Sequence, residues 1–143
     1  MSWESSQLYY QLINREVRQR LGGLHSAKLL MYSVDFAPLE KLQHAGDWEA
    51  ASKILIDAAH RVEAGGADFF LIGTNTMHQV ADVVSTAVDI PLLHIADATA
   101  QVLKREGVER VGLLGTAFTM ELDFYRDRIA GCHGIEVVVP EMH

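Results

Sequence analysis

The chain contains one cysteine, Cys132, so an intramolecular disulfide is impossible and a cysteine-based zinc site is unsupported. Basic residues are also scarce: 12 Lys and Arg stand against 19 Asp and Glu, which gives a formal net charge of -7. Because the basic residues form no cluster, nucleic acid and an anionic membrane surface are poor partners for this protein. We interpret Cys132 itself as a structural residue, packed in a turn between a helix and a strand.

Apolar runs of membrane-spanning length are missing as well. No run approaches the roughly 18 residues that a membrane-spanning helix needs. The N-terminus lacks the basic and apolar regions of a signal peptide. We therefore expect a cytoplasmic protein that does not enter a membrane.

The sequence also lacks the motifs that hold common cofactors. No Gly-x-Gly-x-x-Gly follows a predicted strand and no Walker pattern occurs, so a nucleotide would lack its usual phosphate loop. The lysines fall on a predicted strand or on helices rather than at the carboxyl ends of strands, which disfavours a pyridoxal phosphate site. The histidines lack the spacing of zinc ligands. We expect no metal and no cofactor.

What the sequence does contain is a regular alternation of apolar blocks and helical periods, in 143 residues of which 49% are hydrophobic. Strands are predicted at 27–35, 68–73, 92–95, 110–115 and 135–139, and helices at 8–21, 48–64, 77–87, 97–106 and 120–129. Asp47 and Asp97 are the predicted N-caps of two of these helices. Strands that alternate with helices in this way predict an α/β fold with a parallel, doubly wound sheet.

Two of the predicted strands end in a Gly-Thr turn that leads into a helix. The first turn is Gly73-Thr74, and the second is Gly115-Thr116, with Thr119 three residues further on. In open α/β sheets, ligands bind beyond the carboxyl ends of the strands, where the N–H groups of a helix N-terminus favour an anion. Two such turns facing one cleft would suit a ligand with two carboxylates. The alternative is that these threonines are ordinary N-caps.

Polar side chains gather directly after the first of these turns, in Thr74-Asn75-Thr76-Met77-His78. Asn75 can offer both a donor and an acceptor to the ammonium and carboxylate groups of an amino acid. His78 lies on the first helical turn, where it could orient a neighbour or polarise a substrate group. The alternative for His78 is a histidine that caps or packs at the helix start.

Four segments together resemble the aspartate/glutamate racemase family. They are the stretch 74–78, the opening Met-Ser-Trp-Glu-Ser at 1–5, the segment 20–26, and the His-Ile-Ala-Asp-Ala-Thr segment at 94–99. The resemblance covers essentially the whole chain and the motifs occur in the family's order. It implies a cofactor-independent isomerase with two similar α/β domains. The active site would lie between the domains, with one acid/base residue from each flanking the substrate's α-carbon.

The resemblance also implies roles for individual residues. Thr74 stands at the position of the first acid/base residue. The positions that would contact the substrate, a small dicarboxylic amino acid, are Met1, Ser2, Gln43, Asn75, Thr76, Thr116 and Thr119. His78 is a supporting residue. The full-length form is expected to be a homodimer.

Thr74 departs from the family pattern, because most members carry cysteine at this position. A thiol has a pKa of about 8.5 that a helix N-terminus can lower, so a thiolate is accessible near neutral pH. An aliphatic hydroxyl is a far weaker acid and a poor base without a basic neighbour. We expect Thr74 to donate or relay a proton more readily than it removes one, which predicts unequal rates from the two enantiomers.

Two further departures concern the ends of the family pattern. Family members have a strand immediately before the segment matched by 1–5, and a second acid/base cysteine in a downstream Gly-Cys-Thr-Glu-like segment. Neither is present in these 143 residues. We therefore predict a fragment in which residues 1–109 form the first racemase domain without its first strand. Residues 110–143 would begin the second domain.

Two alternatives stay open at this point. One is an inactive remnant of such an enzyme, since the second acid/base residue is missing. The other is a relative on the same scaffold, of the hydantoin racemase, maleate isomerase or arylmalonate decarboxylase type. Asn75 and Thr76 favour an amino-acid substrate over these, and substrate screening distinguishes them.

Overall fold

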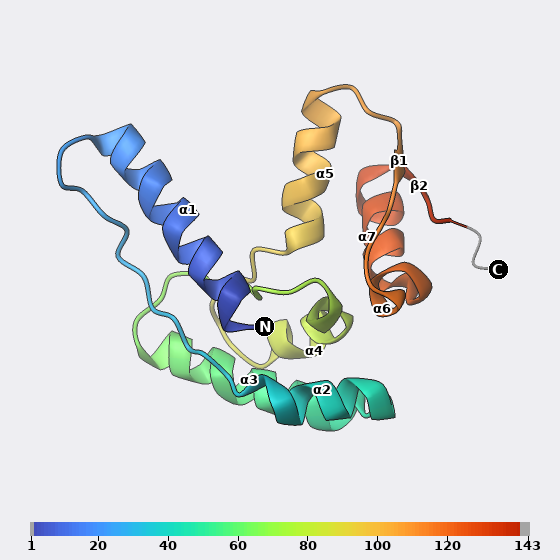
Figure 1. The fold of residues 1–143 in the computed structure, drawn as a ribbon, viewed down its shortest axis with the longest axis horizontal. Helices are drawn as coiled ribbons and strands as arrows, with labels where there is room; N and C mark the ends of the chain where they lie inside the picture. Colours follow the sequence, from blue (N-terminus) through green and yellow to red (C-terminus); the bar gives the residue numbers. More distant parts are fainter. Residues whose placement is uncertain (1, 141–143) are drawn as a thin grey trace.

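The computed structural model describes residues 2–140, which form mostly helices, with two short parallel strands in the C-terminal part (Figure 1). The elements in chain order are α1 (Trp3–Leu21), α2 (Phe36–Ala45), α3 (Trp48–Ala64), the 3-10 helix η1 (Thr76–Val80), α4 (Ala81–Thr86), α5 (Ile95–Arg105), β1 (Arg110–Gly112), α6 (Ala117–Glu121), α7 (Asp123–His133) and β2 (Glu136–Val138). Strands β1 and β2 pair in parallel, and a separate parallel bridge joins Phe70 to Leu92. The predicted α/β class with parallel strands is confirmed.

The helix ends follow the expected capping chemistry at α1 and α3. Ser2 caps α1 by accepting the N–H of Ser5, and α1 ends at Gly22, whose φ of 79° suits glycine. Asp47 caps α3 by accepting the N–H of Ala50, as predicted. At α5 the prediction was wrong: the cap is His94, which accepts the N–H of Ala96, and Asp97 lies inside the first turn. Asp97 is occupied by other partners, described below.

The largest difference from the sequence prediction lies in the strands of the N-terminal part. Residues 27–35 form no strand, and 68–73 pair only through the bridge from Phe70 to Leu92. Residues of a strand need a hydrogen-bonded neighbour, and the described residues place none beside 27–34. In the same way 92–95 reduces to that bridge, because α5 already begins at Ile95.

The sequence prediction also missed helix α2. Pro38 lies in its first turn, where the missing N–H of proline costs nothing because that N–H has no partner inside the helix. Asp35 caps the helix by accepting the N–H of Ala37. Proline is disfavoured inside helices, but this position is one of the few that a helix tolerates.

The helices predicted at 77–87 and 120–129 are each divided in two. The first consists of η1 and α4, and the second of α6 and α7, which meet at Leu122. Residue Leu122 has extended backbone angles, so it ends one helix and precedes the next. The last predicted strand, 135–139, is present as β2.

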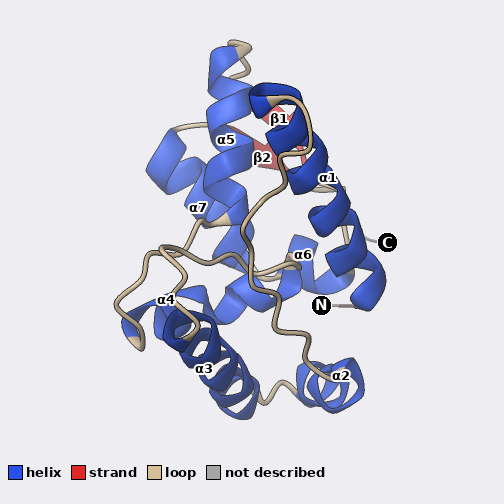
Figure 2. Cartoon of the chain, turned by 90° about the vertical axis from the view of Figure 1, so that its left-hand side faces the viewer, coloured by secondary structure: helices blue, strands red, loops and turns tan. Residues whose placement is uncertain are grey.

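Two clusters of buried side chains make up the interior. The first gathers residues of α2, α3, η1 and α4 with the 70–72 segment, and its fully buried side chains include Leu39 and Met77. The second is centred on α5, α7 and β2 and includes Tyr125 and Ile129. Figure 2 shows the two groups, with α3 and α4 in one and α5, α7 and the β1–β2 pair in the other. The predicted division at 109/110 stays a prediction, and α5, which precedes it, packs on the second cluster.

The lengths of the helices and the exposure of Cys132 bear on two further expectations. Within residues 2–140, no helix combines the length and apolar character needed to cross a membrane. The interpretation of Cys132 as a packed residue was wrong, because this side chain is exposed in the last turn of α7.

Candidate active site

The Gly73-Thr74 turn lies where the 70–72 segment ends and η1 begins. The N–H of Thr74 donates to the carbonyl of Ile72 at 2.8 Å, which turns the chain sharply. Thr74 is half-buried and Asn75 is exposed, whereas Thr76 is buried. The hydroxyl of Thr74 and the amide of Asn75 are therefore within reach of a ligand from solvent.

The opening segment of the chain lies against this turn. The Ser5 hydroxyl donates to the carbonyl of Gly73 at 3.0 Å, across 68 residues of sequence. Ser2, one turn earlier, caps the same end of α1. The start of α1, which Ser2 caps, therefore lies against the Gly73-Thr74 turn. Met1 lies outside the described residues.

The buried side chain of His78 contacts the backbone of the Gly73-Thr74 turn. Its Nδ1 lies 2.7 Å from the carbonyl oxygen of Thr74, and the N–H of Ile95 donates to its Nε2 at 3.4 Å. These contacts fit a neutral ring that donates from Nδ1 and accepts at Nε2. Burial lowers the pKa of His78, which favours this neutral form near pH 7. A neutral His78 couples the backbone of Thr74 to the start of α5.

His94 lies beside His78, and sequence reasoning missed it. The two ring centroids are 4.3 Å apart in an edge-to-face arrangement. Burial, followed by the neighbouring His78, lowers the pKa of His94 to about 4. A signal was available: His94 directly follows the segment around Leu92, as Thr74 follows the 70–72 segment, so both lie at the carboxyl ends of neighbouring parallel segments.

An ion-pair network anchors α5 next to this histidine pair. Arg128 of α7 donates two hydrogen bonds to the Asp97 carboxylate, both at 2.8 Å, and Nε2 of His133 lies 2.9 Å from the same carboxylate. The hydrogen bonds from Arg128 hold the pKa of Asp97 well below its usual range. These contacts link the start of α5, where His94 and Ile95 lie, to α7 of the second cluster.

Three other predicted site residues already have partners within the protein. The Gln43 amide is buried and its Nε2 lies 2.9 Å from the sulfur of Met77, beneath η1. Thr116 caps α6 by accepting the N–H of Thr119, and their hydroxyl oxygens are 3.2 Å apart. These contacts correspond to the N-cap alternative for the second Gly-Thr turn. Thr116 is exposed but engaged, whereas Thr74 and Asn75 are at least partly exposed and make no side-chain hydrogen bond within residues 2–140.

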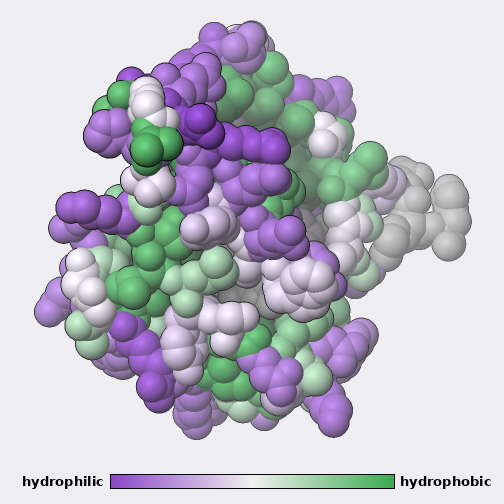
Figure 3. Space-filling model, turned by 60° about the vertical axis from the view of Figure 1, so that its left-hand side comes forward, coloured by the Kyte–Doolittle hydropathy of each residue, from purple (hydrophilic) through white to green (hydrophobic). Residues whose placement is uncertain are grey.

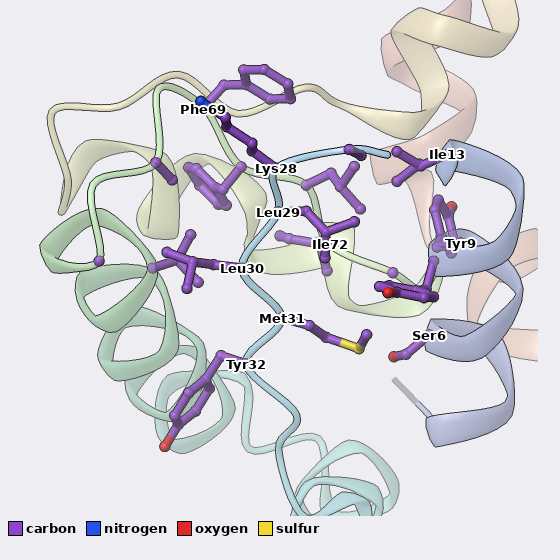
Figure 4. A pocket seen from close by; sticks show the side chains of 18 of the residues that line it. Ser6, Tyr9, Ile13, Lys28, Leu29, Leu30, Met31, Tyr32, Phe69 and Ile72 are labelled. Carbon is purple, nitrogen blue, oxygen red and sulfur yellow. The ribbon is translucent and has the colours of Figure 1, made fainter. Parts of the chain in front are cut away.

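The candidate site is an open turn rather than an enclosed cavity. Apolar side chains lie among polar ones on one face of the molecule (Figure 3), and the structure has a large groove beside α1 and a smaller one next to it (Figure 4). Neither groove is lined by Thr74, Asn75 or Thr116. The hydrogen bonds found among residues 2–140 include none from the Thr74 hydroxyl. No three His, Cys, Asp or Glu side chains in that part of the chain are grouped as metal ligands. The turn thus offers a hydroxyl and an amide at the protein surface.

The low pKa of His94 predicts a loss of stability in mild acid. Unfolded histidine binds a proton near pH 6.5, whereas folded His94 resists it until about pH 4, so the unfolded state binds more protons as the pH falls between these values. The contribution of His94 to the free energy of unfolding is fully present above pH 6.5. We expect the free energy of unfolding to fall by about 2 kcal/mol between pH 7 and 4.5. Urea unfolding at several pH values measures this change.

The matched control for this prediction is His94→Asn. Asparagine is a good N-cap that does not titrate, so it keeps the cap of α5 without the proton. The variant should lose part of the pH dependence, and His78, whose pKa is also lowered, should account for the rest. An equally steep loss in the variant would contradict the role assigned to His94.

Comparisons with known proteins agree with the motifs. The model of a family described as Asp/Glu/Hydantoin racemase matches residues 1–143. A crystal structure from Yersinia pestis, assigned provisionally as an Asp/Glu racemase, is 52% identical with a TM-score of 0.94, and an aspartate racemase homologue from Pyrococcus horikoshii is 37% identical with a TM-score of 0.82. Each match covers 98% of this chain and 61% of the other.

A curated relative is also similar over part of the chain. The broad-specificity amino-acid racemase RacX of Bacillus subtilis is 30% identical over 92 residues, which are 64% of this chain and 40% of RacX. The match therefore spans less than two thirds of the length of each of these three proteins.

Proposed function

This chain belongs to the Asp/Glu/Hydantoin racemase family, and we propose that it supplies one side of the active site of a cofactor-independent amino-acid racemase. The observation that carries the proposal is the Thr74 turn. It presents a hydroxyl and an amide to solvent beside the start of α1, and His78 fixes its backbone. The family match, over all 143 residues, supports the isomerase class.

In the proposed reaction, Thr74 takes part in proton transfer on one face of the substrate's α-carbon. The second acid/base group would come from the part of the protein outside these 143 residues. Inversion requires one group to remove the α-proton and the other to return a proton on the opposite face. Because the Thr74 hydroxyl is a weak base, we propose that it mainly donates, so that one enantiomer reacts faster.

The substrate we propose is a dicarboxylic amino acid such as aspartate or glutamate. Asn75 can bind its carboxylate and ammonium groups, and Ser2 and Thr76 add hydroxyls near the same turn. Thr116 and Thr119 would bind the second carboxylate only after giving up their contact with each other. The homodimer and the cytoplasmic location stay predictions.

A chimera tests this proposal. The segments of the Yersinia pestis protein that lie outside the match are joined to this chain, and the product is incubated with L-aspartate or L-glutamate in heavy water without added cofactor. We expect the α-proton signal to disappear from the NMR spectrum. Hydantoins, maleate and arylmalonates are screened in parallel. Failure to exchange either amino acid, with a folded chimera, would contradict the proposed activity.

A further inference from the structure

Helix α6, which follows the second Gly-Thr turn, is joined to the first cluster by the side chain of Phe118. The ring of Phe118 lies 5.6 Å from the ring of His44 and 6.1 Å from that of Trp48, measured between centroids. Both contacts are edge-to-face, with interplanar angles of 70° and 87°, which is a favourable arrangement for aromatic rings. In Figure 1, α6 lies beside the end of α2, where the chain turns into α3.

The two rings that receive this side chain belong to the same packed unit as the first Gly-Thr turn. Trp48, the first residue of α3, packs on the first cluster. His44, in the last turn of α2, follows Gln43, whose buried amide lies 2.9 Å from the sulfur of Met77. Met77 belongs to η1 and comes three residues after Thr74. The aromatic contact therefore connects the second turn, through α2 and η1, to the first.

Phe118 lies between the two threonines of the second turn. Thr116 caps α6, and Thr119 is buried directly after Phe118. Helix α6 has five residues and ends at Leu122, whose extended backbone separates it from α7. Helix α7 packs on η1 and holds the second cluster against the first at a different place. Because an extended residue separates the two helices, the orientation of α6 needs a contact of its own, and Phe118 supplies one.

We propose that Phe118 is a positioning residue, whose packing on His44 and Trp48 sets the separation of the two Gly-Thr turns and so favours a ligand that spans both. This inference rests on the proposed function, since it takes the substrate to be a dicarboxylic amino acid. Two carboxylates joined by a short chain can contact both turns only when the turns are correctly spaced. The ring of Phe118 packs on other rings, so its loss should weaken substrate binding rather than slow proton transfer at Thr74.

The separation of the turns can be measured without any activity, on the 143-residue chain. Spin labels are attached to Asn75→Cys, next to the first turn, and Glu121→Cys, in α6, after Cys132→Ser has removed the exposed thiol. Double electron–electron resonance gives the distribution of distances between the labels. We expect a narrow distribution in the parent and a broader or shifted one in Phe118→Ala. Phe118→Tyr keeps the ring and should restore the narrow distribution.

Phe69→Ala is the matched control for this measurement. It removes the same side chain from a position that is 51% exposed and lines the groove beside α1. The distance distribution should stay unchanged in this variant. An unchanged distribution in Phe118→Ala, or equal broadening in Phe69→Ala, would show that Phe118 does not position the second turn.

Kinetics of the chimera supply a second readout. Phe118→Ala should raise KM for L-aspartate and L-glutamate by about tenfold, while kcat changes by less than about threefold. Phe118→Tyr should restore KM. A fall in kcat with KM unchanged would contradict the positioning role. An inactive chimera would contradict the proposed function instead, and the distance measurement would still decide whether Phe118 sets the separation of the turns.

Discussion

Replacing Thr74 by cysteine is expected to raise the rate of α-proton exchange by about 100-fold or more in the chimera described above. A thiol with a pKa of about 8.5 supplies a thiolate near neutral pH, whereas the threonine hydroxyl does not ionise there. Within residues 2–140 no hydrogen bond joins the Thr74 hydroxyl to a basic group, and the nearby His78 directs Nδ1 to the carbonyl of Thr74 instead. The gain should be largest for the enantiomer whose proton Thr74 has to remove.

Thr74→Val is the complementary change, since valine has nearly the shape of threonine but no hydroxyl. We expect exchange from both enantiomers to fall toward the background rate while the fold is kept. Exchange is followed by NMR in heavy water, and circular dichroism checks the fold. Asn75→Ala, which alters binding rather than proton transfer, should raise KM more than it lowers kcat. Full activity in Thr74→Val would show that position 74 is not a proton-transfer site.

Replacing Asp97 by alanine is expected to lower the free energy of unfolding by about 2–3 kcal/mol. The carboxylate accepts two hydrogen bonds from Arg128 and contacts His133, and its side chain is 28% exposed. Without Asp97, the partly buried Arg128 loses its closest counter-charge, since Asp82 is 3.8 Å away and almost fully exposed. The cost therefore includes an unpaired guanidinium as well as the lost hydrogen bonds.

Urea unfolding at pH 7 measures this loss, and Asp57→Ala is the matched control. Asp57 pairs with Arg61 on the outer face of α3, with both side chains 57% exposed, so its removal should have a much smaller effect. A double-mutant cycle of Asp97→Ala with Arg128→Ala isolates the coupling of the pair. NMR of the Asp97 variant should also show shifted amide signals at Thr74 and Asn75, because Ile95 bonds to His78. Equal effects of Asp97→Ala and Asp57→Ala would contradict the anchoring role.

Helix α3 and the strands β1 and β2 show what local sequence predicts well. A capping Asp47, a sustained helical period and a final glycine pair specify α3 without help from other segments. The strand predicted at 27–35 shows the opposite case. Its apolar residues have the composition of a strand, yet a strand exists only when a neighbour accepts and donates its hydrogen bonds. That neighbour cannot be identified from the segment itself.

The same distinction applies to the candidate site. The sequence predicts the Gly-Thr turn, the helix after it and the family motifs. A buried strand followed by polar residues and a helix start is a local pattern. Tertiary packing brings together His78 and His94, which are 16 positions apart in the sequence. It also brings together Asp97 and Arg128, which are 31 positions apart. Spacing rules for helices and strands do not reach across such distances.

The sequence by itself determined the α/β class, most helix positions and the polar turn at 74–78, since these depend on periodicity and capping within a few residues. Only the tertiary structure decided which side chains surround that turn, which threonines are already engaged as caps, and which apolar surfaces remain uncovered. Those outcomes depend on contacts between distant segments, where burial shifts a pKa and a missing neighbour leaves a strand unpaired.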